Sequence, residues 1–385
     1  MSIKLSSNNV LFYLINLGLC HPEDLVSITI ASHNTLLVSL RQGINLVVKQ
    51  ERYYYDDDDN PINFPLADEL RFYQVLSSTL DLSYENIHFD LDNSIFVYQY
   101  PKNYINLKGC CQNPNNLSIF MAESVGHALA LLHRQSLSSE ACYRVMNEMN
   151  NGKLVYQFPY PIHLQDKLEP ERFFTMPPDS YKLIHFFQMS ESLNRTVKEV
   201  IAQVKYYCLT HNNLDFYNIL ITENKKNYFS QSEEKKQNLI KLINWEKCSW
   251  GDPAFDLGTI ISKYLLLWLT SLIVHPDIKL ETSLQLAITP LDKIQPSIVG
   301  LTKAYLNTWP EILNDYPEFL KRVVEFAGLA LIYHIVEIIR AFRGFNNQSM
   351  CILQVAKNLL CSPEKSFKSV FGLTQAEFLS SFNFQ

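Results

Sequence analysis

The stretch that decides the fold is residues 210–220, which read THNNLDFYNIL. Further along the chain come LINWE at residues 242–246 and GDPAFDL at residues 251–257. Each segment places a short polar loop beside a β-branched or apolar run, a pattern typical of loops that adjoin buried strands.

The order and spacing of these segments resemble motifs of the aminoglycoside phosphotransferase and choline kinase superfamily, whose members are relatives of the protein kinases. The family patterns are H-G-D-x-x-x-x-N-(I/L)-L, I-D-W-E and G-D-P-x-x-D-L. The resemblance implies an α+β, bilobal protein-kinase-like fold with a small antiparallel β lobe and a larger, mainly helical lobe. It places the small lobe at residues 1–100, a hinge at 101–108 and the helical lobe at 109–385.

Two aspartates of the family pattern are replaced by asparagine. Asn213 stands at the position of the catalytic aspartate, and an amide cannot accept a proton near neutral pH. Losing general-base help costs about 10²–10⁴ in rate. Asn244 stands at the main magnesium position, and Asn218 matches the family's metal-binding asparagine. Because magnesium prefers anionic oxygen ligands, the resemblance implies a weakened magnesium site and impaired phosphoryl transfer.

Other acidic residues of the motifs are candidates to compensate. Asp215 is the strongest of them, because it follows Asn213 by two residues on the same loop. The alternative is that Asp215 is a loop-surface or capping carboxylate. Glu246 and Asp252 also lie within the motifs. His211 is expected to brace the backbone of this loop.

The N-terminal region carries the features of a kinase-like small lobe. Three antiparallel strands are predicted, at residues 25–30, 36–40 and 46–50. By the resemblance, Lys49 grips the nucleotide phosphates, and Glu69 of a predicted helix at 68–76 pairs with it. Asn34 matches an asparagine that follows a glycine-rich turn in the family. The turn here, SHNT at 32–35, has no glycine, so its backbone stays farther from a phosphate.

The remaining chain is predicted to be mostly helical. After a last small-lobe strand at 94–100, helices are expected at 118–134, 191–207 and 325–342. His133 is expected to be structural, Asp252 to cap the next helix, and Asp256 to bond back to the loop at 210–220. Prolines interrupt residues 145–200, a polar insertion spans 223–237, and the aspartates at 56–59 are expected in a solvated loop.

Composition excludes several classes of protein. The net charge of −6 gives no support for nucleic-acid binding, and eight scattered cysteines in 385 residues do not form a disulfide framework. The cysteines are expected to be reduced and mostly buried. The N-terminal apolar stretch is expected to be a helix rather than a signal peptide, and no membrane span is predicted. A cytoplasmic location is therefore expected.

Three functions are consistent with these residues. The leading hypothesis is a kinase-fold protein that binds ATP, is impaired in phosphoryl transfer and acts as a pseudokinase-type binding or regulatory partner. The alternative is an active atypical kinase that transfers the ATP γ-phosphate to a hydroxyl of a small molecule or a peptide Ser/Thr, for example in peptide natural-product maturation. A pure scaffold that binds no nucleotide is the third. The expected partners are a nucleotide and either an acceptor or a protein.

Overall fold

The computed structural model describes most of the chain. The described residues are 3–32, 34–50, 54–55, 61–62, 69, 86–90, 92–111, 118–140, 142–144, 180–223, 239–275, 277–342 and 344–382. The predictions for the aspartates 56–59, for the helix at 68–76 apart from Glu69, for the proline-rich residues 145–179 and for the insertion 224–238 concern residues outside the described part.

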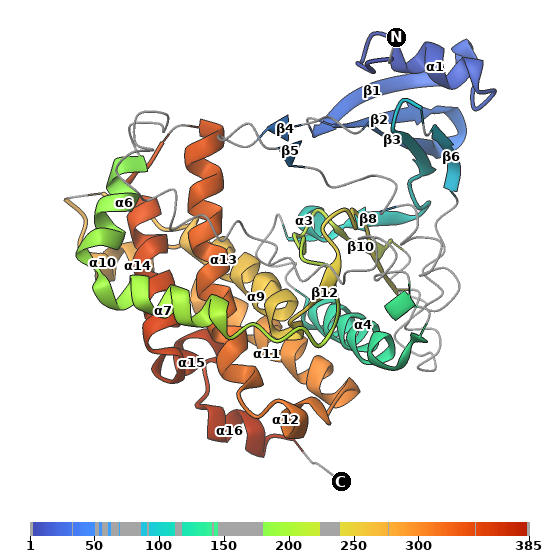
Figure 1. The fold of residues 1–385 in the computed structure, drawn as a ribbon. Helices are drawn as coiled ribbons and strands as arrows, with labels where there is room; N and C mark the ends of the chain where they lie inside the picture. The colour runs from blue at the N-terminus through green and yellow to red at the C-terminus, as the bar shows by residue number, and fades with distance from the viewer. Residues whose placement is uncertain are drawn as a thin grey trace.

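A twisted antiparallel sheet forms the N-terminal part of the molecule (Figure 1). Its five strands lie in the order β1-β2-β3-β7-β6. Their bounds are β1 Leu25–Ser32, β2 Thr35–Leu40, β3 Ile44–Gln50, β6 Asn86–Asp90 and β7 Ile95–Gln99. A separate pair, β4 Tyr54–Tyr55 and β5 Pro61–Ile62, lies beside this sheet.

The two faces of this sheet pack against different partners. Helix α1, Val10–Asn16, covers one face, where its apolar side chains form a small core with Val38, Val48 and Val97. Because side chains alternate along a strand, the neighbouring residues point the other way. Val47 and Tyr98, which lie opposite each other, belong to the main core that continues into the rest of the molecule. Lys49 lies on this second face.

Short strands between the sheet and the helices bring the three polar segments together. Strands β8 Tyr104–Asn106, β10 Ile219–Thr222 and β11 Ile240–Leu242 form one small sheet, and β9 Cys208–Thr210 pairs with β12 Ser249–Gly251. The loop at 211–218 therefore connects β9 to β10, and the loop at 243–248 connects β11 to β12. Both loops lie at the same end of these strands, because Ile219 pairs with Leu242 and Thr210 pairs with Ser249. Strands β8, β10 and β12 lie below the N-terminal sheet (Figure 1).

The rest of the molecule is helical. Its long helices are α4 Ile119–Ser138, α9 Pro253–Leu269, α11 Leu291–Thr308, α13 Phe319–Phe342 and α14 Asn347–Cys361. Shorter helices are α3 Leu107–Cys110, α6 Ser180–Met189, α7 Glu191–Ala202, α10 Leu280–Gln285, α12 Ile312–Asp315, α15 Pro363–Phe371 and α16 Gln375–Ser380. Helices α9 and α13 approach closely, because Gly258 has no side chain to hold Val323 away.

The predicted α+β architecture is confirmed, with a small antiparallel sheet and a larger helical region. Some bounds differ from the prediction. Helix α13 begins at Phe319, earlier than predicted. Its first turns were missed because the charged residues Arg322 and Glu325 interrupt the apolar pattern, although the two form a buried ion pair at 2.9 Å. Helix α7 ends at Ala202, after which the backbone turns to donate to Asp252. Strand β6 was not predicted.

Three observations bear on the class of protein that the composition predicts. Within the described part of the chain, no helix is long and apolar enough to cross a membrane. Six of the eight cysteines are buried, as expected. Nowhere in that part of the chain do three or more His, Cys, Asp or Glu side chains gather as they would around a metal ion.

Candidate functional site

The buried ammonium of Lys49 is the positive centre of the site. Its Nζ lies 2.6 and 2.9 Å from the two carboxylate oxygens of Glu69, so the predicted pair forms, and both side chains are buried. A second carboxylate, that of Glu246, lies 3.3 Å away. Burial alone would lower the pKa of Lys49, but Glu69 and Glu246 outweigh it and raise that pKa above its usual value. Lys49 is therefore charged.

Two buried residues hold the loop at 211–218 in place. The carboxylate of Asp256 accepts from the backbone N–H groups of His211, at 2.7 Å, and Asn212, at 2.9 Å. The His211 ring lies 3.0 Å from the Ile243 carbonyl through Nε2, and the backbone N–H of Asn213 lies 3.2 Å from its Nδ1. These contacts require a neutral ring with its proton on Nε2, and burial lowers the pKa of His211 accordingly. The expected bracing roles of His211 and Asp256 are confirmed.

Two asparagines adopt backbone conformations that most residues avoid. Asn212 has φ of 59° and Asn244 has φ of 66°, both in the left-handed region that asparagine tolerates. The Asn212 amide also donates to Ser249 Oγ at 2.7 Å and to the Lys247 carbonyl at 3.0 Å. These bonds tie the loop at 211–218 to the segment after β11, so the two loops form one rigid unit.

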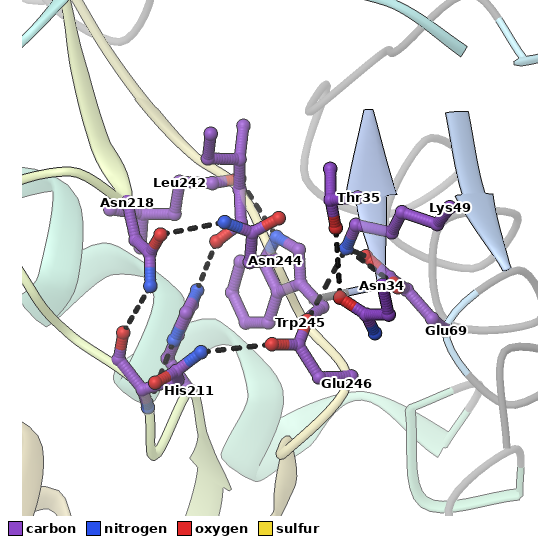
Figure 2. Close-up of polar contacts among 12 residues, drawn as sticks. Asn34, Thr35, Lys49, Glu69, His211, Asn218, Leu242, Asn244, Trp245 and Glu246 are labelled. Carbon is purple, nitrogen blue, oxygen red and sulfur yellow. Dashed lines mark hydrogen bonds and ion pairs between the residues drawn. The ribbon is translucent and has the colours of Figure 1, made fainter. Parts of the chain in front are cut away.

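Glu246 connects this unit to the N-terminal sheet. One of its carboxylate oxygens accepts from the Asn213 amide at 3.0 Å, and the other lies 3.3 Å from Lys49 Nζ. Figure 2 shows the contact of Glu246 with Lys49. Burial would raise the pKa of Glu246, but Lys49 lowers it below the usual value, so the carboxylate is ionised at neutral pH. The sequence favoured Asp215 as the acid nearest Asn213, but the contact is made by Glu246.

Asn218 and Asn244, the residues of the predicted metal position, are hydrogen-bonded to each other. Asn218 donates its amide to the Asn213 carbonyl at 2.7 Å, which directs its own oxygen toward Asn244. The Asn244 amide donates to that oxygen at 2.6 Å (Figure 2). The pair thus offers magnesium no carboxylate, and the oxygen of Asn218 is already an acceptor. Because magnesium prefers anionic oxygens, these residues do not fit it.

Asp215 has partners of its own. Its carboxylate lies 2.8 Å from Lys263 Nζ and accepts from the backbone N–H of Tyr217 at 3.1 Å. The second contact is a local turn of the kind that aspartate favours. The structure therefore brings Asp215 to Lys263 rather than to Asn213, which is the arrangement of the alternative prediction.

Asn34 lies at the tip of the β1–β2 hairpin, near Lys49 and Glu69 (Figure 2). Its side-chain oxygen accepts from the Thr35 hydroxyl at 3.0 Å, and its carbonyl accepts from the Gln50 backbone at 2.9 Å. The turn therefore closes over the end of β3, which carries Lys49.

Further motif residues take the structural roles expected of them. Asp252 caps α9 by accepting from the Ala254 backbone at 3.0 Å. His133 is fully buried and contacts Tyr305 at 2.8 Å and Asp256 at 3.2 Å. Trp245 is fully buried and packs on the His211 ring, with centroids 4.3 Å apart.

Comparison with known proteins gives a match by structure alone. No protein-family model and no curated protein matches the sequence. An ethanolamine kinase from Plasmodium vivax is 15% identical, with a TM-score of 0.54 over 96% of this chain and 93% of that chain. This chain therefore shares its fold with that ethanolamine kinase.

Two other solved structures are similar to this chain over most of their length. A choline kinase from Streptococcus pneumoniae is 15% identical with a TM-score of 0.46, over 92% of this chain and 99% of that chain. An aminoglycoside 2'-phosphotransferase in a GDP complex is 12% identical with a TM-score of 0.49, over 95% and 100% of the two chains. The predicted resemblance to the aminoglycoside phosphotransferase and choline kinase superfamily is borne out at the level of fold.

Proposed function

We propose that this protein binds a nucleoside triphosphate such as ATP between the N-terminal sheet and the loops at 211–218 and 243–248. We further propose that it is impaired in phosphoryl transfer and serves as a pseudokinase-type binding or regulatory partner. The observation that carries the proposal is a contrast within one site. The Lys49–Glu69 pair is kept and buried, whereas Asn218 and Asn244 bond to each other at the metal position.

Lys49 supports the nucleotide part of the proposal. A buried ammonium next to a polar loop is a strong ligand for phosphate oxygens, and Glu69 holds it in position. The carboxylate of Glu246 at 3.3 Å occupies the side of Lys49 that faces the loops. A nucleotide phosphate that binds Lys49 therefore displaces the Glu246 carboxylate, so that one anion replaces another.

Two features support impaired transfer. Asn213 donates its amide to Glu246, so neither the amide nor its orientation suits the removal of a proton from an acceptor hydroxyl. Glu246 itself has a lowered pKa, which makes it a weak base at neutral pH. Without a carboxylate at Asn244, the charge of a transferring phosphoryl group lacks its usual metal partner.

An active atypical kinase is the second candidate, and the placement of Glu246 favours it. This carboxylate touches Asn213, so an ionised oxygen is present where the family uses its catalytic aspartate. The acceptor in this case is a hydroxyl of a small molecule or a peptide. The fold likeness to an ethanolamine kinase is compatible with either candidate.

ATP binding to the full chain, measured by calorimetry, tests the proposal. Lys49→Met is expected to weaken ATP binding at least about tenfold, since a charge-assisted contact is lost. Lys293→Met is the matched control, because Lys293 is exposed on α11. The proposal fails if the wild type does not bind ATP, or if the two variants bind it equally well.

Transfer of radiolabelled γ-phosphate separates the two candidates. The pseudokinase proposal expects no phosphate release or transfer above a no-enzyme control. Turnover that disappears in Glu246→Gln would instead establish the active kinase with Glu246 as its acid–base residue.

A further inference from the structure

Basic side chains gather around Asp215 on the helical side of the loop. Lys263 of α9 lies 2.8 Å from the Asp215 carboxylate, and these side chains are 23% and 35% exposed. Burial would raise the pKa of Asp215, but Lys263 and then Lys108 of α3 lower it below the usual value. The carboxylate is therefore ionised, and both lysines act on it.

His334 reaches the same place from α13. Helices α9 and α13 pack together with the rings of Phe255 and Phe326 5.5 Å apart. Lys263 follows Phe255 along its helix by the same eight residues as His334 follows Phe326. Burial, Lys263 and Lys108 lower the pKa of His334 to about 4, against the opposing effect of Asp215. The ring is neutral at neutral pH, so two cations face one anion here.

The basic groups of this cluster have unused hydrogen-bonding capacity. Among the residues that the structure describes, no carboxylate lies within ion-pair distance of Lys108, and no hydrogen bond holds the His334 ring. The Lys263 ammonium has three donors, of which Asp215 accepts one. All three basic side chains are partly buried yet reachable from solvent.

The cluster is fixed relative to Asn213. Asp215 follows Asn213 by two residues, and the backbone N–H of Lys108 donates to the Phe216 carbonyl at 3.1 Å. Phe216 packs on Tyr264 of α9 with centroids 4.9 Å apart, next to Lys263. A molecule bound at Asn213 therefore has this cluster as its neighbour along the same loop.

We propose that Lys108, Lys263 and His334 bind an anionic group, a phosphate or a carboxylate, of the second molecule that this protein holds next to Asn213. The lysines supply charge, and the neutral ring of His334 supplies a further donor. Asp215 orients Lys263 and competes with the ligand for it. That the ligand is the partner of a bound nucleotide rests on the proposed function, whereas anion binding does not.

Titration with inorganic phosphate, followed through the His334 ring signals in NMR, tests the proposal. The signals are assigned by their loss in His334→Gln. A saturable shift with a dissociation constant on the order of 1–10 mM is expected for phosphate, and acetate in a parallel arm shows whether a carboxylate binds as well. Tetramethylammonium, a cation, is expected to cause no saturable shift.

Two substitutions must act in opposite directions. Lys108→Met is expected to weaken phosphate binding about fivefold, and Asp215→Asn to tighten it about threefold by removing the competing carboxylate. Lys293→Met is expected to change nothing. A purely structural cluster would give no saturable shift, or would weaken binding in both variants, and either result overturns the proposal. Because no nucleotide is present, failure of ATP binding elsewhere leaves this test intact.

Discussion

Replacing Asn213 by aspartate tests whether the contact with Glu246 is real and stabilising. The Asn213 amide donates to the Glu246 carboxylate at 3.0 Å, in a site where both side chains are partly buried. Asn213→Asp turns this donor into a second negative oxygen without changing its size. A substitution toward the family's own catalytic residue is thus expected to destabilise this protein.

The magnitude follows from the geometry. A hydrogen bond to a charged group contributes about 1.5–3 kcal/mol to stability. Two unit charges about 4 Å apart repel by about 4 kcal/mol at an effective dielectric constant of about 20. Because Asn213 and Glu246 are partly exposed and rotate apart, we expect Asn213→Asp to lower the free energy of unfolding by about 2–4 kcal/mol at neutral pH.

Urea unfolding followed by circular dichroism measures this change. Asn347→Asp is the matched control, because Asn347 is exposed at the start of α14 and its substitution is expected to change stability by less than about 0.5 kcal/mol. In the Glu246→Gln background the cost of Asn213→Asp is expected to fall below about 1 kcal/mol, since the new amide donates to the new carboxylate. An equal cost in both backgrounds would refute the reasoning.

Three more outcomes are expected. Asn244→Asp supplies the missing carboxylate, so ATP binding measured by calorimetry should become at least about tenfold tighter with magnesium than with EDTA. Burial, then Lys263, lower the pKa of His334 from about 6.5 to about 4. As the pH falls, His334 is therefore protonated in the unfolded chain before it is protonated in the folded chain. The contribution of His334 to the free energy of unfolding is therefore complete above pH 6.5 and is lost as the pH falls toward 4. In urea titrations across that range, we expect the wild type to lose about 1–2 kcal/mol more than His334→Gln, a figure that allows for the partial exposure of the ring. Gly258→Ala places a methyl group 2.6 Å from the Val323 carbonyl, and thermal unfolding should show a loss of about 1–3 kcal/mol.

The fold was predictable from the sequence where a motif fixes both a loop and its strands. The loops at 211–218 and 243–248 have little freedom, because His211 and Asp256 must bond to particular backbone groups. Strand β6 was missed because residues 86–90, NIHFD, mix polar and apolar side chains without a clear alternation. The strand lies at the edge of the sheet, where such a mixture is tolerated. Its partner β7 begins at Ile95, only a short turn further along the chain, so a hairpin with the predicted strand at 94–100 was the signal that could have found β6.

The site was only partly predictable. The pair of Lys49 and Glu69 followed from the resemblance. The choice between Asp215 and Glu246 did not, because spacing along a loop does not fix the direction of a side chain. Asp215 folds back on the Tyr217 backbone and meets Lys263, which comes from a helix nearly fifty residues later. Asn212 and Asn244 were local signals of tight turns in these loops, since asparagine is among the few residues that tolerate the left-handed conformation.

The central claim is that Lys49 anchors a nucleotide while the Asn218–Asn244 pair leaves no place for magnesium. Calorimetry of wild-type protein with ATP, once in excess magnesium and once in EDTA, tests it most directly. We predict binding in both conditions, with dissociation constants that agree within about threefold, or about 0.7 kcal/mol. Binding that requires magnesium, or no binding at all, would contradict it.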